Sequence, residues 1–132
     1  MIPTLEGFAP LLQVFDMPRS LAFYRDVLGF TVAGASEPGD NPDWVLLRRD
    51  GIELMLNTMY ERDGRPAAPP PDRTAAHRDT GLFFGCRDLD AACAHLRANG
   101  VDATTPATAP YGMRQVWARD PDGYEICLQW PV

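Results

Sequence analysis

The chain has 132 residues, of which 45% are hydrophobic, and a formal net charge of −6. A domain of this length buries roughly two thirds of its unfolded surface, so three cysteines without a CxxC spacing predict reduced thiols in a cytoplasmic protein rather than a disulfide framework. The acidic balance, with basic residues spread along the chain, predicts no nucleic-acid partner, and the lack of an apolar run of about 18 residues predicts no membrane span.

The first third of the chain predicts a strand, a helix and a second strand. The first strand covers residues 8–15, and Asp16 is a favourable N-cap for the helix that follows. Gly29 ends this helix, because glycine readily adopts the left-handed conformation that closes helices, and residues 30–33 continue as a strand. The helix carries an apolar stripe at three- and four-residue steps, formed by Leu21, Tyr24, Val27 and Leu28.

A hairpin is predicted at residues 44–57, with Asp50-Gly51 as its two-residue turn. Side chains alternate along a strand, so one face of this hairpin is purely apolar and should pack on a helix, whereas the other mixes polar and aromatic groups. On the mixed face the turn sets three pairs opposite each other: Arg48 and Glu53, Leu46 and Met55, Trp44 and Asn57.

The second half repeats this order of elements. Residues 60–80 contain four prolines and no periodicity, and are interpreted as a linker or flap without a helix or strand. A strand is then predicted at 81–86, and Asp88 caps a helix over 89–99 that Gly100 ends. A short strand at 101–104, a loop at 105–112 and a hairpin at 113–130 complete the chain.

The final hairpin turns at Asp120-Pro121-Asp122-Gly123, in which each residue type favours a tight turn. Alternation places Glu125, Cys127 and Gln129 on one face of its last strand, and Tyr124, Ile126, Leu128 and Trp130 on the other.

Short sequences also match between the halves. Val14-Phe15-Asp16-Met17 matches Cys86-Arg87-Asp88-Leu89 at an offset of 72, and Ile52-Glu53-Leu54 matches Ile126-Cys127-Leu128 at an offset of 74. We therefore predict an α+β fold in a single domain, 1–132, with βαβββ modules at 8–58 and 81–132 joined by a Pro-rich linker loop at 59–80. The modules are expected to form an open, curved sheet that lines a cleft, with the helices outside.

Two motifs in these modules point to a known family. The first half contains Val14-x-Asp16-x-x-x-Ser20-Leu21-x-Phe23-Tyr24-x-x-Val27-Leu28-Gly29-Phe30, and the second contains Asp120-Pro121-Asp122-Gly123-Tyr124-x-Ile126-x-Leu128. Together they resemble the vicinal oxygen chelate superfamily, which includes glyoxalase I, bleomycin-resistance proteins and extradiol dioxygenases. The resemblance covers residues 8–130 and implies the same fold, a small-molecule ligand and a homodimer.

The resemblance also identifies where a metal would bind. Enzymes of this superfamily hold a divalent metal through four positions, which correspond here to Ala9, Glu53, Gly81 and Cys127. Ala9 and Gly81 have no donor atom, whereas Fe, Ni or Zn sites need at least three protein ligands. His77 and His95 are interpreted as exposed histidines rather than ligands. We therefore expect no metal and no cofactor.

Without a metal, the cleft is predicted to bind a planar or amphipathic ligand through aromatic stacking. Glu53 would meet a cationic group unless Arg48 pairs with it, and Gln13 and Asn57 would orient the ligand. The side that Trp117 faces is left open, because the register of a four-residue turn is not fixed by sequence. The candidate site residues are Gln13, Trp44, Arg48, Glu53, Met55, Asn57, Phe83, Tyr111, Trp117 and Cys127.

Three functions fit these observations. The first is a metal-free binding protein, similar to the bleomycin-resistance branch, that sequesters an aromatic or amphipathic compound and so confers antibiotic resistance. The second is an enzyme, either a glyoxalase-like or dioxygenase-like metal enzyme with displaced ligands, or a lyase or isomerase with Glu53 as general base. The third is a module that binds another protein through an exposed sheet edge or through the Pro-rich loop. We favour the first, because the donor set for a metal is incomplete.

Overall fold

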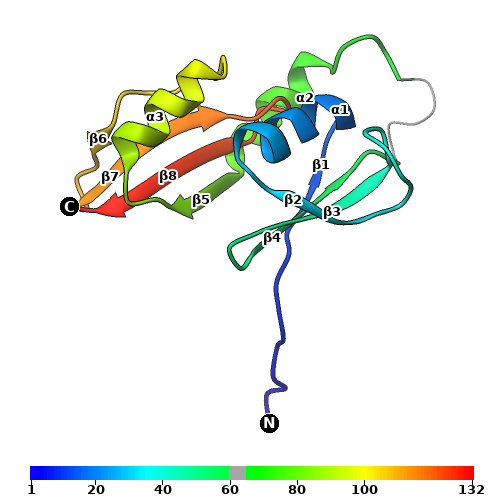
Figure 1. Cartoon of the computed structure of the whole chain (residues 1–132), viewed down its shortest axis with the longest axis horizontal. Helices are drawn as coiled ribbons and strands as arrows, with labels where there is room; N and C mark the ends of the chain where they lie inside the picture. Colours follow the sequence, from blue (N-terminus) through cyan, green and yellow to red (C-terminus); the bar gives the residue numbers. More distant parts are fainter. Residues whose placement is uncertain (60–64) are drawn as a thin grey trace. The chain divides into compact units, whose positions relative to one another are not determined.

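The structure is a computed structural model that describes residues 1–59 and 65–132 (Figure 1). The chain divides into two compact units, Met1–Pro66 and Ala67–Val132, and each is described by itself. None of the helices in the described part of the chain is long and apolar enough to cross a membrane.

The first unit is a four-stranded sheet with one helical segment. Its sheet order is β1-β4-β3-β2, in which β1 runs parallel to β4 and the other neighbours are antiparallel. The elements are β1 (Leu11–Gln13), α1 (Met17–Leu21), the π-helical segment η1 (Ala22–Val27), β2 (Thr31–Ala35), β3 (Trp44–Arg49) and β4 (Ile52–Asn57).

The β3–β4 hairpin forms as predicted, with Arg48 opposite Glu53 and Trp44 opposite Asn57. Asp50 and Gly51 both have positive φ angles, 49° and 80°, which a two-residue turn requires and which Asp-Gly tolerates well. Since strand alternation is thereby fixed, the apolar face of the sheet is buried together with the helical stripe. The buried side chains of this core include Leu12, Val45, Leu47, Leu54 and Leu56 from the strands and Met17, Leu21 and Tyr24 from the helix.

The predicted helix forms, but its winding changes from α-helical to π-helical after Leu21. The Asp16 side chain accepts a hydrogen bond from the Arg19 backbone N–H at 3.3 Å, which confirms the N-cap. Beyond Leu21 the winding becomes π-helical, and the Leu28 N–H donates to the Phe23 carbonyl, five residues back, at 2.9 Å.

The flanking strands differ in extent from the prediction. The first strand was predicted at 8–15 but spans only Leu11–Gln13, because Phe8 is exposed and Pro10 has no N–H for a ladder. Pro10 contributes only its carbonyl, which accepts from the Met55 N–H at 2.8 Å. β2 extends to Ala35 through a bulge between Val32 and Gly34.

The second unit repeats the arrangement. Its sheet order is β5-β8-β7-β6, with β5 parallel to β8, and α3 lies across β7 and β8 in Figure 1. Its elements are α2 (Pro71–Ala76), the 3-10 turn η3 (His77–Asp79), β5 (Gly81–Gly85), α3 (Leu89–Ala98), β6 (Ala107–Thr108), β7 (Met113–Arg119) and β8 (Glu125–Pro131). Two repeats of β-α-β-β-β confirm the predicted α+β fold class, while the cleft expected between the sheets stays a prediction.

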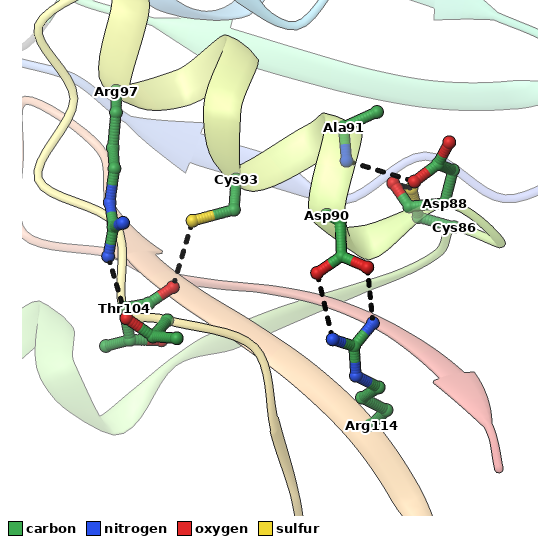
Figure 2. A network of polar contacts seen from close by, with 9 residues as sticks. Cys86, Asp88, Asp90, Ala91, Cys93, Arg97, Thr104 and Arg114 are labelled. Carbon is green, nitrogen blue, oxygen red and sulfur yellow. Dashed lines mark hydrogen bonds and ion pairs between the residues drawn. The ribbon is translucent and has the colours of Figure 1, made fainter.

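Polar contacts hold α3 against its sheet (Figure 2). Asp88 caps the helix by accepting from the Ala91 N–H at 3.0 Å, as the sequence predicts. Asp90, in the first turn, forms an ion pair at 2.9 Å with Arg114 of β7. Arg114 donates hydrogen bonds that hold the pKa of the exposed Asp90 carboxyl below its usual value. The helix face turned to the sheet is apolar and buried, with Leu89, Cys93 and Leu96.

Two predictions for this unit are wrong. Residues 60–80 were expected to contain no helix, yet α2 and η3 occupy residues 71–79; Pro71 fits the first turn of a helix, where no N–H bond is lost. Residues 60–64 of that segment lie outside the described residues. The strand predicted at 101–104 is absent from the described chain, and β6 forms later, at Ala107–Thr108. Thr104 lies outside any strand but still contacts β7, because the Trp117 backbone N–H donates to the Thr104 hydroxyl at 2.9 Å.

Candidate functional site

Each sheet has one face that is not part of its apolar core. In the first unit the β3–β4 hairpin sets five predicted site residues on this face, and β1 adds the sixth, Gln13, beside Asn57 of β4. We define the first mixed face as Gln13, Trp44, Arg48, Glu53, Met55 and Asn57.

The polar groups of the first mixed face are already engaged with one another. Arg48 donates to a Glu53 carboxylate oxygen at 2.8 Å from Nη2 and 3.2 Å from Nε, which confirms the predicted cross-strand pair. The buried Asn57 amide accepts from the Met59 N–H at 3.2 Å and donates to the Gln13 side-chain carbonyl at 3.3 Å. The Trp44 indole packs over Gly34, which has no side chain to displace the ring.

The second unit sets three predicted site residues in one row across its strands. Cys127 of β8 is paired with Phe83 of β5 on one side and with Trp117 of β7 on the other. Trp117 therefore faces the same side as Cys127, which the sequence left open. The two rings meet edge to face, with centroids 5.4 Å apart and planes at 86°, while the Phe83 side chain stays 52% exposed.

A buried glutamine organises the polar side of this row. Gln115 is 6% exposed, and its amide nitrogen Nε2 lies 2.6 Å from the Tyr111 hydroxyl and 3.0 Å from Gln129 Oε1. Its carbonyl oxygen accepts from the Trp117 indole N–H at 3.3 Å. We define the second mixed face as Phe83, Tyr111, Gln115, Trp117, Cys127 and Gln129.

Two members of the second mixed face were not predicted as site residues. Alternation in the sequence already placed Gln129 on the side of Cys127, so that signal was available. Gln115 could be found only from the β7–β8 register, which pairs it with Gln129. Its position follows from the length of the Asp120–Gly123 turn, which the sequence alone does not fix.

Glu125 is a third residue that sequence reasoning missed. It lies opposite Arg119 in the hairpin, and Arg119 Nε donates to its carboxylate at 3.3 Å. In the parallel pair β5–β8 it is the partner of Gly81, while Cys127 is the partner of Phe83.

The strand registers give a different correspondence between the halves from the motif match. Leu11 pairs with Met55 in the first unit, and Phe83 pairs with Cys127 in the second. Leu11 and Phe83 are equivalent positions, because the first motif match has an offset of 72. Their strand partners are then equivalent too, so Cys127 corresponds to Met55 and Glu125 corresponds to Glu53. The match of Ile52-Glu53-Leu54 to Ile126-Cys127-Leu128 is a likeness in sequence that is shifted by two residues from the backbone register.

The Cys127 thiol is a poor nucleophile at neutral pH. The side chain is fully buried, and desolvation raises the pKa of this thiol to about 11, because the charged thiolate loses its hydration. The thiolate form, which attacks electrophiles, is thus scarce at pH 7.

The side chains at the metal positions implied by the resemblance do not fit a divalent metal. Ala9 and Gly81 carry no donor, so only Glu53 and Cys127 remain, and Arg48 already holds Glu53. Among residues 1–59 and 65–132, no group of three His, Cys, Asp or Glu side chains lies close enough to hold a metal ion.

The two histidines do not complete such a set. His77 was predicted to be an exposed loop residue, but it is half-buried: its ring stacks on Tyr124 at 4.1 Å, and its Nδ1 lies 2.7 Å from the Asp122 carbonyl. This packing follows from η3, which brings the histidine onto the final turn. His95 is exposed on α3, as predicted.

Comparison with known proteins agrees with the fold and the motifs. The model of the Glyoxalase/Bleomycin resistance protein/Dioxygenase superfamily matches residues 7–128. The uncharacterized protein YaeR of Escherichia coli (strain K12) is 33% identical over 117 residues, which cover 86% of this chain and 86% of that protein. Lactoylglutathione lyase of Haemophilus influenzae is 33% identical over 128 residues, with 88% of this chain and 85% of that protein covered.

A solved structure shares the same architecture. The antibiotic binding protein TnmS3 from Streptomyces sp. CB03234 superimposes with a TM-score of 0.68 at 25% identity, over 98% of this chain and 100% of that chain. The sequence matches and the superposition both extend over nearly the whole chain. The chain therefore belongs to the glyoxalase/bleomycin resistance protein/dioxygenase superfamily.

Proposed function

We propose that this protein binds small aromatic molecules without changing them chemically and without a divalent metal. The observation that carries the proposal is the second mixed face. Phe83 and Trp117 offer rigid aromatic surface there, and Gln115, Gln129 and Tyr111 supply polar groups in fixed positions. Binding sites for small molecules combine apolar and aromatic walls with a few fixed polar groups in this way.

The first mixed face supports the same function. Trp44 adds a flat surface, and Gln13 and Asn57 form an ordered amide pair beside it. Glu53 is the acid considered for proton transfer, but Arg48 holds one of its oxygens at 2.8 Å. A general base must reach a substrate proton with a free lone pair, and an ion-paired carboxylate is less suited to that task than a solitary one.

The relatives differ in what they do. TnmS3 is an antibiotic binding protein, which favours ligand capture, and sequestration of a toxic aromatic compound would make this chain a resistance protein. The Haemophilus relative is a lactoylglutathione lyase, which favours an enzyme. The donor set decides our preference, because two of the four positions that would hold the metal are Ala9 and Gly81.

Calorimetric titration with a panel of planar aromatic compounds tests the proposal. We expect saturable binding that is unchanged after treatment of the protein with EDTA. Trp117→Ala should weaken binding at least tenfold, since stacking on a large ring accounts for much of the affinity at such sites. Arg114→Gln is the matched control, because Arg114 is the neighbour of Gln115 in β7 and pairs with Asp90 on the helix-covered side (Figure 2).

Two results would contradict this function. One is loss of binding on EDTA treatment, restored by added metal. The other is stoichiometric Fe, Ni, Mn or Zn in the purified protein together with turnover of a hemithioacetal or a related substrate. The first would show that binding needs a metal, and the second would establish the lyase alternative that the lactoylglutathione lyase relative suggests.

A further inference from the structure

The Phe83 ring lies close to the bare backbone of Gly81, the first residue of β5. Side chains two residues apart project from the same face of a strand, so position 81 lies beside position 83. A Cβ at Gly81 would be 3.0 Å from Cε1 of the Phe83 ring and 3.6 Å from Cδ1. The first distance is shorter than an ordinary contact between carbon atoms. The ring therefore occupies space that a side chain at position 81 would need.

The backbone at position 81 does not itself require glycine. Gly81 is absent from the glycines with a positive φ angle, so its strand conformation is open to other residues. Within the described part of the chain, the atoms that come within 4 Å of the missing Cβ, its chain neighbours aside, all belong to Phe83. Packing at position 81 is thus limited by this one ring.

Position 81 is also one of the four positions through which enzymes of the superfamily hold their metal. A side chain that carries a donor atom there would compete with Phe83 for the same space. The Phe83 side chain is 52% exposed, so the aromatic surface beside Gly81 is open to a ligand. The lack of a donor at position 81 and the placement of the ring are therefore two aspects of one arrangement.

We propose that Gly81 is a positioning residue for ligand binding, because its missing side chain lets Phe83 lie where it can stack on an aromatic ligand. The inference rests on the proposed function, since it concerns the same second mixed face. Phe83 is the stacking surface in this arrangement. Trp117 stands at 86° to it and so meets the same planar ligand at a right angle. A side chain at position 81 would displace the ring and weaken binding.

Nuclear magnetic resonance of the ligand-free chain tests whether position 81 places the ring. The Trp117 indole N–H signal, assigned with Trp117→Phe, reports the ring because the two aromatic groups are 5.4 Å apart. Gly81→Val should shift this signal, and Gly81→Ala should shift it less. In a Phe83→Ala background, Gly81→Val should leave it unchanged. Gly85→Ala is the control on the same strand, since its new carbon makes an ordinary contact of 3.5 Å with Trp130.

Calorimetric titration measures the effect on binding. The probes are three planar compounds of different charge: proflavine, 2-naphthol and 2-naphthoate. For the probe that binds the native chain most tightly, we expect Gly81→Val to weaken binding about five- to tenfold and Gly81→Ala about twofold. Phe83→Ala should weaken binding by about as much as Gly81→Val. Adding Gly81→Val to Phe83→Ala should cause no further loss, because both changes act through the same ring.

Denaturant unfolding separates positioning from a general structural role. Valine favours strands and restricts the unfolded chain more than glycine does. Gly81→Val should therefore be at least as stable as the native chain while it binds the probe more weakly. A loss of stability that parallels the loss of affinity would overturn the positioning role.

The remaining outcomes distinguish this inference from the function on which it rests. Unchanged affinity of Gly81→Val would overturn the role of Gly81 and leave the binding function in place. Equal losses from Gly81→Val with and without Phe83 would also overturn that role. An unmoved Trp117 signal in Gly81→Val would overturn the placement of the ring, whether or not a probe binds. Saturable binding of none of the three probes by the native chain would overturn the proposed function itself.

Discussion

At the scale of single residues, the local environment decides what a side chain can do. Cys127 is placed by sequence in the last strand, but its chemistry depends on Phe83 and Trp117, which lie on either side of it and leave it without solvent contact. A thiol in this setting behaves as a small apolar group. Glu53 shows the same dependence. Arg48 forms an ion pair with its carboxylate, and this pairing limits Glu53 as a general base or as a binding group for a cation.

The buried thiol leads to a prediction about pH. The pKa of Cys127 rises from 9.0 to about 11 on folding, so the folded state resists ionisation and its stability should fall as the pH rises from about 9 to 11. Urea unfolding at pH 7.5, 9 and 10.5 should show this fall. The chain has no lysine, which removes one class of group that would titrate in this range.

Cys127→Ala is the control for this prediction. The variant should lose part of the alkaline fall, because no thiol remains to be ionised at that position. Native Cys127 should also resist alkylation by iodoacetamide at pH 7.5, while the half-buried Cys86 reacts first. Rapid modification of Cys127 in the folded protein, located by peptide mass spectrometry, would contradict the burial of the thiol.

At the scale of elements, close backbone contacts explain α2, which the sequence did not predict. A side-chain carbon at Gly123 would lie 2.3 Å from the backbone carbonyl oxygen of Thr74 in α2. The helix therefore rests directly on the final turn, and His77 stacks on Tyr124 beside it. The glycine of Asp-Pro-Asp-Gly serves the turn through its φ of 88° and also serves the docking of α2.

This contact predicts a difference between two glycines of the second unit. Gly123→Ala should destabilise the protein clearly more than Gly112→Ala, which has a similar φ of 86° but open space where the new carbon would lie. Gly112→Ala carries only the backbone strain, about 1 kcal/mol, whereas Gly123→Ala must also displace α2. Denaturant unfolding of both variants measures the difference, and equal losses would mean that α2 does not rest on Gly123.

At the scale of the whole molecule, the family membership and the exposed apolar groups bear on assembly. Phe8 and Leu11 in the first unit and Phe83 in the second are large apolar side chains that remain exposed. Apolar groups mark interaction surfaces where they gather into a patch, and Phe8 and Leu11 lie near each other in sequence. The family resemblance implies a homodimer, and we expect Phe8 and Leu11 to contribute to its interface.

Light scattering coupled to gel filtration tests this expectation. We predict a mass near twice the 14.6 kDa of the single chain. Phe8→Ser should shift the equilibrium toward the monomer if this residue contributes to the interface, whereas Arg114→Gln, on the helix-covered side of its sheet, should not. A monomer over the whole accessible concentration range would contradict the predicted dimer.

The sequence by itself determined the two β-α-β-β-β repeats, the helix caps at Asp16 and Asp88, and the first mixed face. Caps and turns are local, and a two-residue Asp-Gly turn leaves a single register, so Arg48 had to meet Glu53. The second mixed face depended on the tertiary structure. Its longer turn leaves several registers open, so the facing of Trp117 and the place of Gln115 follow from long-range strand pairing, which no short stretch of sequence encodes.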